Sequence, residues 1–102
     1  MSKILIVGGT KGIGEAISNE LLDKECVIFS RESYQVKSAN HTHYSLDVKD
    51  GVYPEIDDIE SIIYCPGTIN LKPFRSLKDD DFQNDFEVNV KGAVRVIQHY
   101  QR

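Results

Sequence analysis

Apolar and polar positions follow two periods along this chain, one typical of buried strands and one typical of helices. An apolar run at residues 3–7 predicts a central parallel strand buried on both faces. Residues 26–30 and 59–65 predict two more strands, and a weaker run at 42–46 predicts another. Apolar residues recur at helical spacing over 13–25 and 76–102, whereas 32–41 and 49–59 allow a short helix at most. Strands alternating with helices predict an α/β fold.

Each predicted helix has an apolar stripe that we expect to face the sheet. The first consists of Ile13, Ala16, Ile17 and Leu21. The second begins after Ser76-Leu77-Lys78-Asp79, which resembles a capping box, and consists of Phe82, Phe86, Val90, Ala93, Ile97 and Tyr100. Asn89 falls on this second stripe. A buried polar residue needs hydrogen-bond partners, and such conflicts with the local pattern tend to mark function.

A glycine-dense turn, Val7-Gly8-Gly9-Thr10-Lys11-Gly12-Ile13-Gly14, joins the first strand to the first helix. Glycine allows a tight turn, brings backbone N–H groups close to a phosphate and lets the helix pack closely on the sheet. The helix amino terminus adds unpaired donors and partial positive charge. The spacing is looser in its first half than Gly-x-Gly-x-x-Gly, and a glycine-rich turn that binds nothing is the alternative.

Gly-Gly-Thr-Lys-Gly-Ile-Gly at 8–14, together with Val88-Asn89-Val90-Lys91-Gly92, resembles the short-chain dehydrogenase/reductase family. The resemblance implies a Rossmann-type doubly wound parallel sheet, of which residues 1–102 form a single, partial dinucleotide-binding domain. It corresponds to the amino-terminal half of the family's length. Right-handed crossovers predict the strand order 3-2-1-4, which leaves the fourth strand as an apolar, unpaired edge.

Arg31 follows the second strand and indicates which cofactor binds. At this place an acidic residue accepts the ribose 2′-OH, and a basic one accommodates a 2′-phosphate. Ser30 adds a hydroxyl, and in the family a basic residue at the position of Lys11 accompanies NADP preference. We therefore expect NADP(H) in preference to NAD(H). A solvated surface arginine is the alternative, and Glu32 is a competing charge.

The resemblance extends to the ends of the third and fourth strands. Asp47 resembles the aspartate that contacts adenine, with the following backbone N–H at Val48, although Asp47 also suits a turn. Tyr64-Cys65-Pro66-Gly67 stands where the family has Asn-Asn-Ala-Gly. The predicted cofactor-binding residues are Gly8, Thr10, Lys11, Gly12, Ile13, Gly14, Ser30, Arg31, Asp47, Val48, Cys65, Pro66 and Gly67.

The resemblance implies hydride transfer between the cofactor and a small carbonyl or alcohol substrate. Asn89 matches the family residue that holds water in a proton relay, and a core asparagine is its alternative. The family's later serine and Tyr-x-x-x-Lys have no counterpart here, so we expect the chain alone to be inactive. A non-catalytic NADP(H)-binding or interaction module is the competing hypothesis, while Arg31 disfavours S-adenosylmethionine.

Composition and net charge argue against several other classes of partner and site. A net charge of -4 gives no general attraction to nucleic acid or acidic membranes, and no apolar run approaches a membrane span. The amino terminus runs directly into a strand, so we expect a cytoplasmic protein. Cys26 and Cys65 are expected to be free thiols, and no metal site is expected. The unpaired strand 61–65 and the helix 76–102 predict a homodimer or a larger homo-oligomer.

Overall fold

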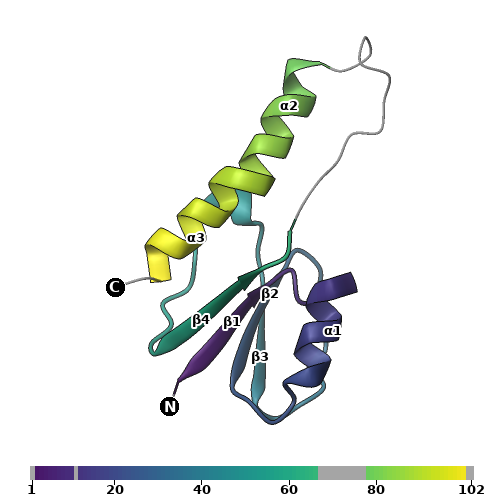
Figure 1. The fold of residues 1–102 in the computed structure, drawn as a ribbon, viewed down its shortest axis with the longest axis vertical. Coiled ribbons are helices and arrows are strands. Elements are labelled where there is room, and N and C mark those ends of the chain that lie inside the picture. Colours follow the sequence, from purple (N-terminus) through teal and green to yellow (C-terminus); the bar gives the residue numbers. More distant parts are fainter. Residues whose placement is uncertain (1, 11, 67–77, 101–102) are drawn as a thin grey trace.

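The computed structural model describes residues 2–10, 12–66 and 78–100. Its four parallel strands, β1 (Lys3–Val7), β2 (Cys26–Ser30), β3 (His41–Ser45) and β4 (Ile59–Tyr64), are arranged in the order β3-β2-β1-β4 (Figure 1). This confirms the predicted fold class and order. The first two strands have the predicted bounds, β3 begins one residue early, and β4 ends one residue early. The predictions for Lys11, Gly67 and Ser76 lie outside the described residues.

The sheet is buried on both faces at its centre. Leu5, Ile6 and Val7 of β1 are at most 1% exposed. Side chains alternate along a strand, so Leu5 and Val7 share one face and Ile6 occupies the other. The first face packs with Val27, Phe29, Val48, Val96 and Tyr100. Ile6 and Ile28 lie against Gly9, next to the start of the first helix.

Helix α1 (Gly12–Glu20) is shorter than the predicted 13–25. The helix ends early because side chains just before β3 and at the first residue of β3 hydrogen-bond to backbone carbonyls that another helical turn would need. Ser38 Oγ donates to the Leu22 carbonyl at 2.6 Å, and the His41 ring bonds the Leu21 carbonyl at 2.8 Å. These partners are distant in sequence, which is why the local pattern overestimates the length of the helix.

The predicted apolar stripe of α1 is partly wrong. Ile13 is 77% exposed, Ala16 is exposed, and the buried residues are Gly14 and Ser18. Small residues face inward because the helix lies directly on the glycine turn. A side chain at Gly14 would collide with the Gly8 carbonyl oxygen.

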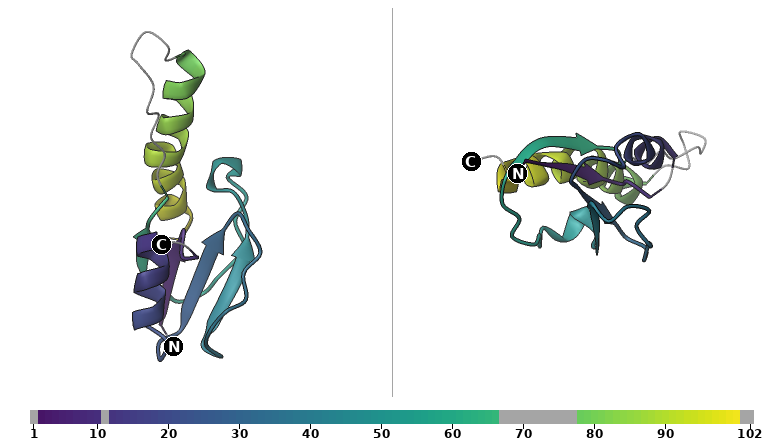
Figure 2. Two further views of the ribbon diagram at one scale, coloured as in Figure 1. Left: turned by 90° about the vertical axis from the view of Figure 1, so that its right-hand side faces the viewer. Right: turned by 90° about the horizontal axis from the view of Figure 1, so that it is seen from below.

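A single long helix forms the carboxyl-terminal part of the fold. It consists of α2 (Asp79–Phe86), a π-helical stretch η3 (Glu87–Lys91) and α3 (Gly92–Tyr100). It begins three residues later than predicted, and Asp81 accepts from the Lys78 backbone N–H at 3.0 Å. The α2 end projects beyond the strands (Figure 2). The molecule measures 50 Å along its longest axis and 19 Å along its shortest.

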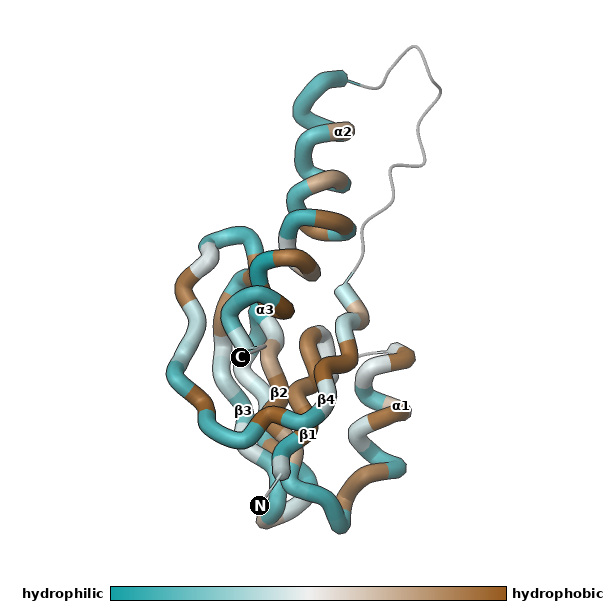
Figure 3. Tube along the Cα trace, turned by 60° about the vertical axis from the view of Figure 1, so that its left-hand side comes forward, coloured by the Kyte–Doolittle hydropathy of each residue, from teal (hydrophilic) through white to brown (hydrophobic). Residues whose placement is uncertain are grey.

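The predicted buried stripe of this helix is wrong for most of its members. Gly92, Val96 and Tyr100 are buried. Hydrophobic positions recur along the helix (Figure 3). Five of its apolar side chains are 42–54% exposed: Phe82, Phe86, Val90, Val94 and Ile97. Asn89 is also exposed rather than buried. The sheet contacts α3 and, through Tyr64, the π-helical stretch, whereas the apolar residues of α2 project beyond the strands.

The remaining segments are short. Residues 32–40 contain neither helix nor strand, as predicted, and 49–58 are irregular except for the end of a single 3₁₀ turn, η1 (Val48–Asp50). Within the described ranges, each helix is too short or too polar to cross a bilayer.

Candidate cofactor-binding site

A cleft of about 310 Å³ lies at the carboxyl ends of all four strands. Open parallel sheets bind ligands at this edge, beside the point where the strand order reverses. Eight predicted residues line it: Gly8, Thr10, Ser30, Arg31, Asp47, Val48, Cys65 and Pro66. Gly12, Ile13 and Gly14 are not among the lining residues. The predicted contacts at Lys11 and Gly67 lie outside the described residues.

The glycines of the turn have separate structural roles. Gly8 has a φ of 78°, and its N–H donates to the Phe29 carbonyl at 2.8 Å. Gly14 lies in α1 with no space for a side chain, because its neighbours there are the backbone atoms of Gly8 and Gly9. Gly12 has a φ of 56° and open space where a Cβ would be. Close helix packing therefore depends on Gly14, and Gly12 is the glycine open to solvent.

The end of β2 brings a cation and a carboxylate to the same side of the cleft. Arg31 and Glu32 are both exposed and both line it. Ser30 Oγ donates to the Glu32 carbonyl at 2.9 Å and lies 2.7 Å from Nε2 of His43. The turn that presents Arg31 is therefore attached to β3 by side-chain hydrogen bonds.

Asp47, after β3, caps the turn that forms the next part of the wall. Its carboxylate accepts from the Lys49 N–H at 3.0 Å, and Gly51 closes η1 with a φ of 70°. The turn role considered for Asp47 is thus present. Its contact with adenine stays a prediction, which the position of Asp47 on the cleft wall allows.

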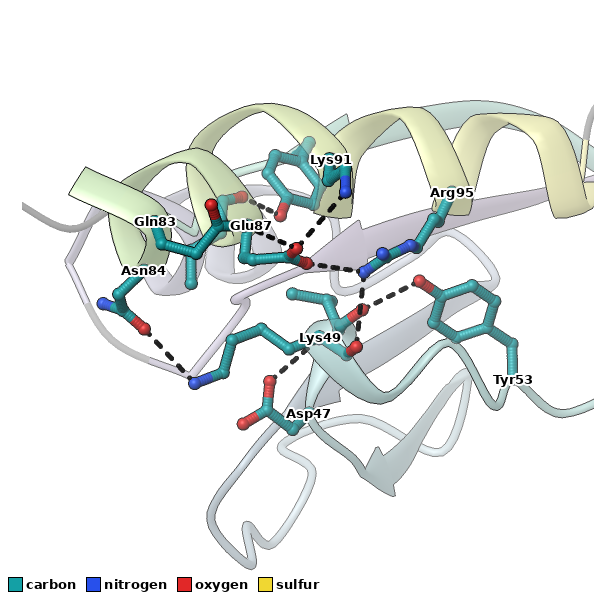
Figure 4. Close-up of polar contacts among 11 residues, drawn as sticks. Asp47, Lys49, Tyr53, Gln83, Asn84, Glu87, Lys91 and Arg95 are labelled. Atoms are coloured by element: carbon teal, nitrogen blue, oxygen red, sulfur yellow. Dashed lines mark hydrogen bonds and ion pairs between the residues drawn. The ribbon is translucent and has the colours of Figure 1, made fainter. Parts of the chain in front are cut away.

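The long helix holds η1 through a polar network (Figure 4). Arg95 Nη1 lies 2.9 Å from Glu87 Oε2 and donates to the Lys49 carbonyl at 3.3 Å, while Lys49 Nζ donates to Asn84 Oδ1 at 3.3 Å. Burial acts to raise the pKa of the Glu87 carboxyl, but the hydrogen bond and charge of Arg95, together with Lys91, outweigh it and lower that pKa. Glu87 is therefore an ionised partner for both cations.

Tyr64 connects β4 to the same helix. Its hydroxyl donates to the Val88 carbonyl at 2.5 Å, inside the π-helical stretch, and leaves no room for a side chain at Gly92. Burial, with smaller contributions from Tyr53 and Asp47, raises the pKa of Tyr64 to about 12. Tyr64 is consequently a structural hydrogen-bond donor and a poor proton source.

The structure adds lining residues that the sequence did not predict: Val7, Phe29, Glu32, Leu46, Lys49 and Val88. Most are chain neighbours of predicted residues at strand ends, so strand-end position was the available signal. Lys49 and Val88 line the cleft because η1 packs on the long helix. Asn89 follows Val88 within η3 but does not line the cleft. Burial raises the pKa of the Cys65 thiol, so this side chain of the cleft lining stays uncharged.

Comparison with known proteins agrees with this arrangement. The profile of the family described as short chain dehydrogenase matches residues 2–102. The chain belongs to this family. It is 26% identical over 116 aligned positions to the uncharacterized oxidoreductase YvrD of Bacillus subtilis (strain 168), covering 95% of this chain and 44% of that protein. It is 29% identical to the NADPH-dependent pterin aldehyde reductase of Arabidopsis thaliana, covering 95% of this chain and 48% of that protein.

A solved structure shares the fold. The short chain dehydrogenase of Leptospira borgpetersenii with bound NAD+ superposes with a TM-score of 0.82 at 20% identity, over 96% of this chain and 44% of that one. The chain therefore spans about half the length of the relatives it matches. Family membership supports binding of a nicotinamide cofactor.

Proposed function

We propose that this chain is the cofactor-binding half of an NADP(H)-dependent oxidoreductase acting on a small carbonyl or alcohol substrate. The observation that carries the proposal is the cleft, where the glycine turn, the end of β2 and η1 converge. The nicotinamide group supplies the hydride chemistry when bound. The residues of this chain bind and orient the cofactor.

Each wall of the cleft suits one part of the dinucleotide. Gly8, Thr10 and the first turn of α1, with Gly12, Ile13 and Gly14, would hold the pyrophosphate through backbone N–H groups. Asp47 and the Val48 backbone would contact adenine. Cys65 and Pro66 would form the wall beside the adenosine ribose.

The preference for NADP(H) rests on Arg31, a cation at the place where the ribose 2′-phosphate is received. The Arabidopsis relative is named as NADPH-dependent, whereas the Leptospira structure contains NAD+. Glu32 lines the same part of the cleft, so the net preference depends on Arg31 outweighing a neighbouring carboxylate.

Calorimetric titration with NADPH and NADH tests the proposal. Arg31→Ala removes a charge-assisted partner of the phosphate, which costs about 1.5–3 kcal/mol, and weakens NADPH binding by about one to two decades while NADH binding barely changes. Lys3→Ala, at the amino end of β1 and remote from the cleft, is the control and leaves both affinities unchanged. Equal losses of both cofactors in the Arg31 variant would contradict the proposal.

The reaction requires a proton donor beyond the cleft described here. Burial raises the pKa of Tyr53 as well as that of Tyr64, which argues against either as the acid. Residues 1–102 are therefore expected to bind NADP(H) without turnover by themselves, and a non-catalytic NADP(H)-binding or interaction module is the alternative. Extending the chain to family length creates activity that depends on Asn89, which would hold water in the proton relay. Turnover by residues 1–102 alone would overturn this division of roles.

Association of copies is the remaining part of the proposal. The exposed apolar row Phe82, Phe86, Val90, Val94 and Ile97, together with the edge strand β4, supports at least a homodimer. Sedimentation at increasing micromolar concentrations tests it, with Phe86→Asp predicted to weaken association. A folded monomer whose mass does not change with concentration would contradict it.

A further inference from the structure

The turn that presents Arg31 is held by side chains of β3 that do not line the cleft. The Glu32 carbonyl accepts from two hydroxyls, Ser30 Oγ at 2.9 Å and Ser45 Oγ at 3.3 Å. Ser30 Oγ is also 2.7 Å from Nε2 of His43. Ser30 and Ser45 are register partners in neighbouring strands, and Ser30 alone of these β2 and β3 residues lines the cleft.

The direction of these hydrogen bonds follows from counting hydrogens. A serine hydroxyl has one hydrogen, and Ser30 gives it to the Glu32 carbonyl. With the Ser30 hydrogen on the Glu32 carbonyl, Ser30 Oγ accepts from His43, whose ring then carries its hydrogen on Nε2. His43 is half-buried with its ring 5.7 Å from that of Tyr34, and burial lowers its pKa, which favours the neutral ring with one donor.

This arrangement lets Ser30 redirect its hydrogen without leaving a polar group unsatisfied. If the hydroxyl turns toward an anion in the cleft, the Glu32 carbonyl keeps the hydrogen bond from Ser45. Ser30 Oγ keeps the hydrogen bond from His43, which polarises the hydroxyl and strengthens its donation. Hydrogen bonds to charged acceptors are about twice as strong as neutral ones, so a phosphate gains more than a ribose hydroxyl.

We propose that His43 is a positioning residue for cofactor choice, which orients the Ser30 hydroxyl as a donor to the 2′-phosphate of NADP(H). This inference rests on the proposed function, because it requires the phosphate to bind beside Arg31. It adds a residue outside the cleft to the set that determines specificity.

The test uses adenosine 2′,5′-bisphosphate (2′,5′-ADP) and 5′-AMP, which differ only in the 2′-phosphate and need no nicotinamide site. The measured quantity is the ratio of their affinities by calorimetry. His43→Ala lowers the preference for 2′,5′-ADP over 5′-AMP about three- to tenfold, the range for losing one hydrogen bond, and barely changes 5′-AMP binding. His43→Gln, which retains an N–H donor, restores most of the ratio. His41→Gln, on the same strand but bonded to the Leu21 carbonyl, leaves it unchanged.

A double-mutant cycle separates positioning from general stability. Ser30→Ala lowers the ratio as much as His43→Ala, and the double variant loses no more than either single one because both act through one hydroxyl. Additive losses, or a His43→Ala ratio equal to that of the unmodified protein, would overturn the inference. If the unmodified protein shows no preference for 2′,5′-ADP, the proposed NADP(H) preference fails instead.

Discussion

Alanine variants at three glycines can distinguish a loss of phosphate binding from a loss of helix packing. Alanine at Gly12 (φ 56°) or at Gly51 (φ 70°) meets no heavy atom within 4 Å, so each pays only the left-handed backbone cost of about 1–2 kcal/mol. Alanine at Gly14 instead collides with the backbone of Gly8 and Gly9, which cannot rotate away. Overpacking of this kind costs about 1–3 kcal/mol and outweighs the gain of about 1 kcal/mol from helix propensity.

Urea denaturation and NADPH calorimetry on the three variants make the comparison. Gly12→Ala and Gly51→Ala lose similar stability, but only Gly12→Ala weakens NADPH binding, by about one decade for each 1.4 kcal/mol of lost phosphate contact. Gly14→Ala loses both stability and affinity, because α1 must move relative to Gly8. Equal NADPH affinities for Gly12→Ala and Gly51→Ala would refute phosphate binding at Gly12, and an unchanged Gly14→Ala protein would refute the packing argument.

Two further predictions concern the long helix. Tyr64→Phe removes the hydrogen bond to the Val88 carbonyl and costs about 1 kcal/mol in urea denaturation, whereas Tyr44→Phe on β3 changes stability by less than about 0.5 kcal/mol; equal effects would contradict the structural role of the hydroxyl. The lowered pKa of Glu87 means that its contribution to stability is present above the usual value of 4.5 and is lost as the pH falls through the lower folded-state pKa. The stability difference between the unmodified protein and Glu87→Gln should therefore shrink below about pH 4.5, and a difference that grows on acidification would contradict the pairing with Arg95 and Lys91.

The strands could be predicted because their signal is local. Leu5, Ile6 and Val7 are apolar in succession, and a central parallel strand is the element that buries such a run on both sides. The strand order followed from crossover handedness and needed no knowledge of side-chain packing. For the same reason, strand ends predicted most of the cleft wall.

Helix ends and helix faces depend on contacts that a local pattern does not contain. The end of α1 depends on Ser38 and His41, and its buried face depends on the space beneath Gly14. The α2 end of the long helix projects beyond the strands, so Phe82 and Phe86 keep helical spacing without a strand to cover them. Asn89 is exposed, and the π-helical stretch that contains it accompanies the Tyr64 hydrogen bond to Val88.

The central claim is that the cleft at the carboxyl ends of the strands binds the cofactor. Backbone amide chemical shifts of the ¹⁵N-labelled protein, recorded during titration with NADPH, test it residue by residue. We predict saturable shifts at Gly8, Thr10, Arg31, Val48 and Cys65, and none at Asp58 or Glu60 near the amino end of β4. The absence of saturable shifts, or shifts concentrated at the amino ends of the strands, would contradict the account.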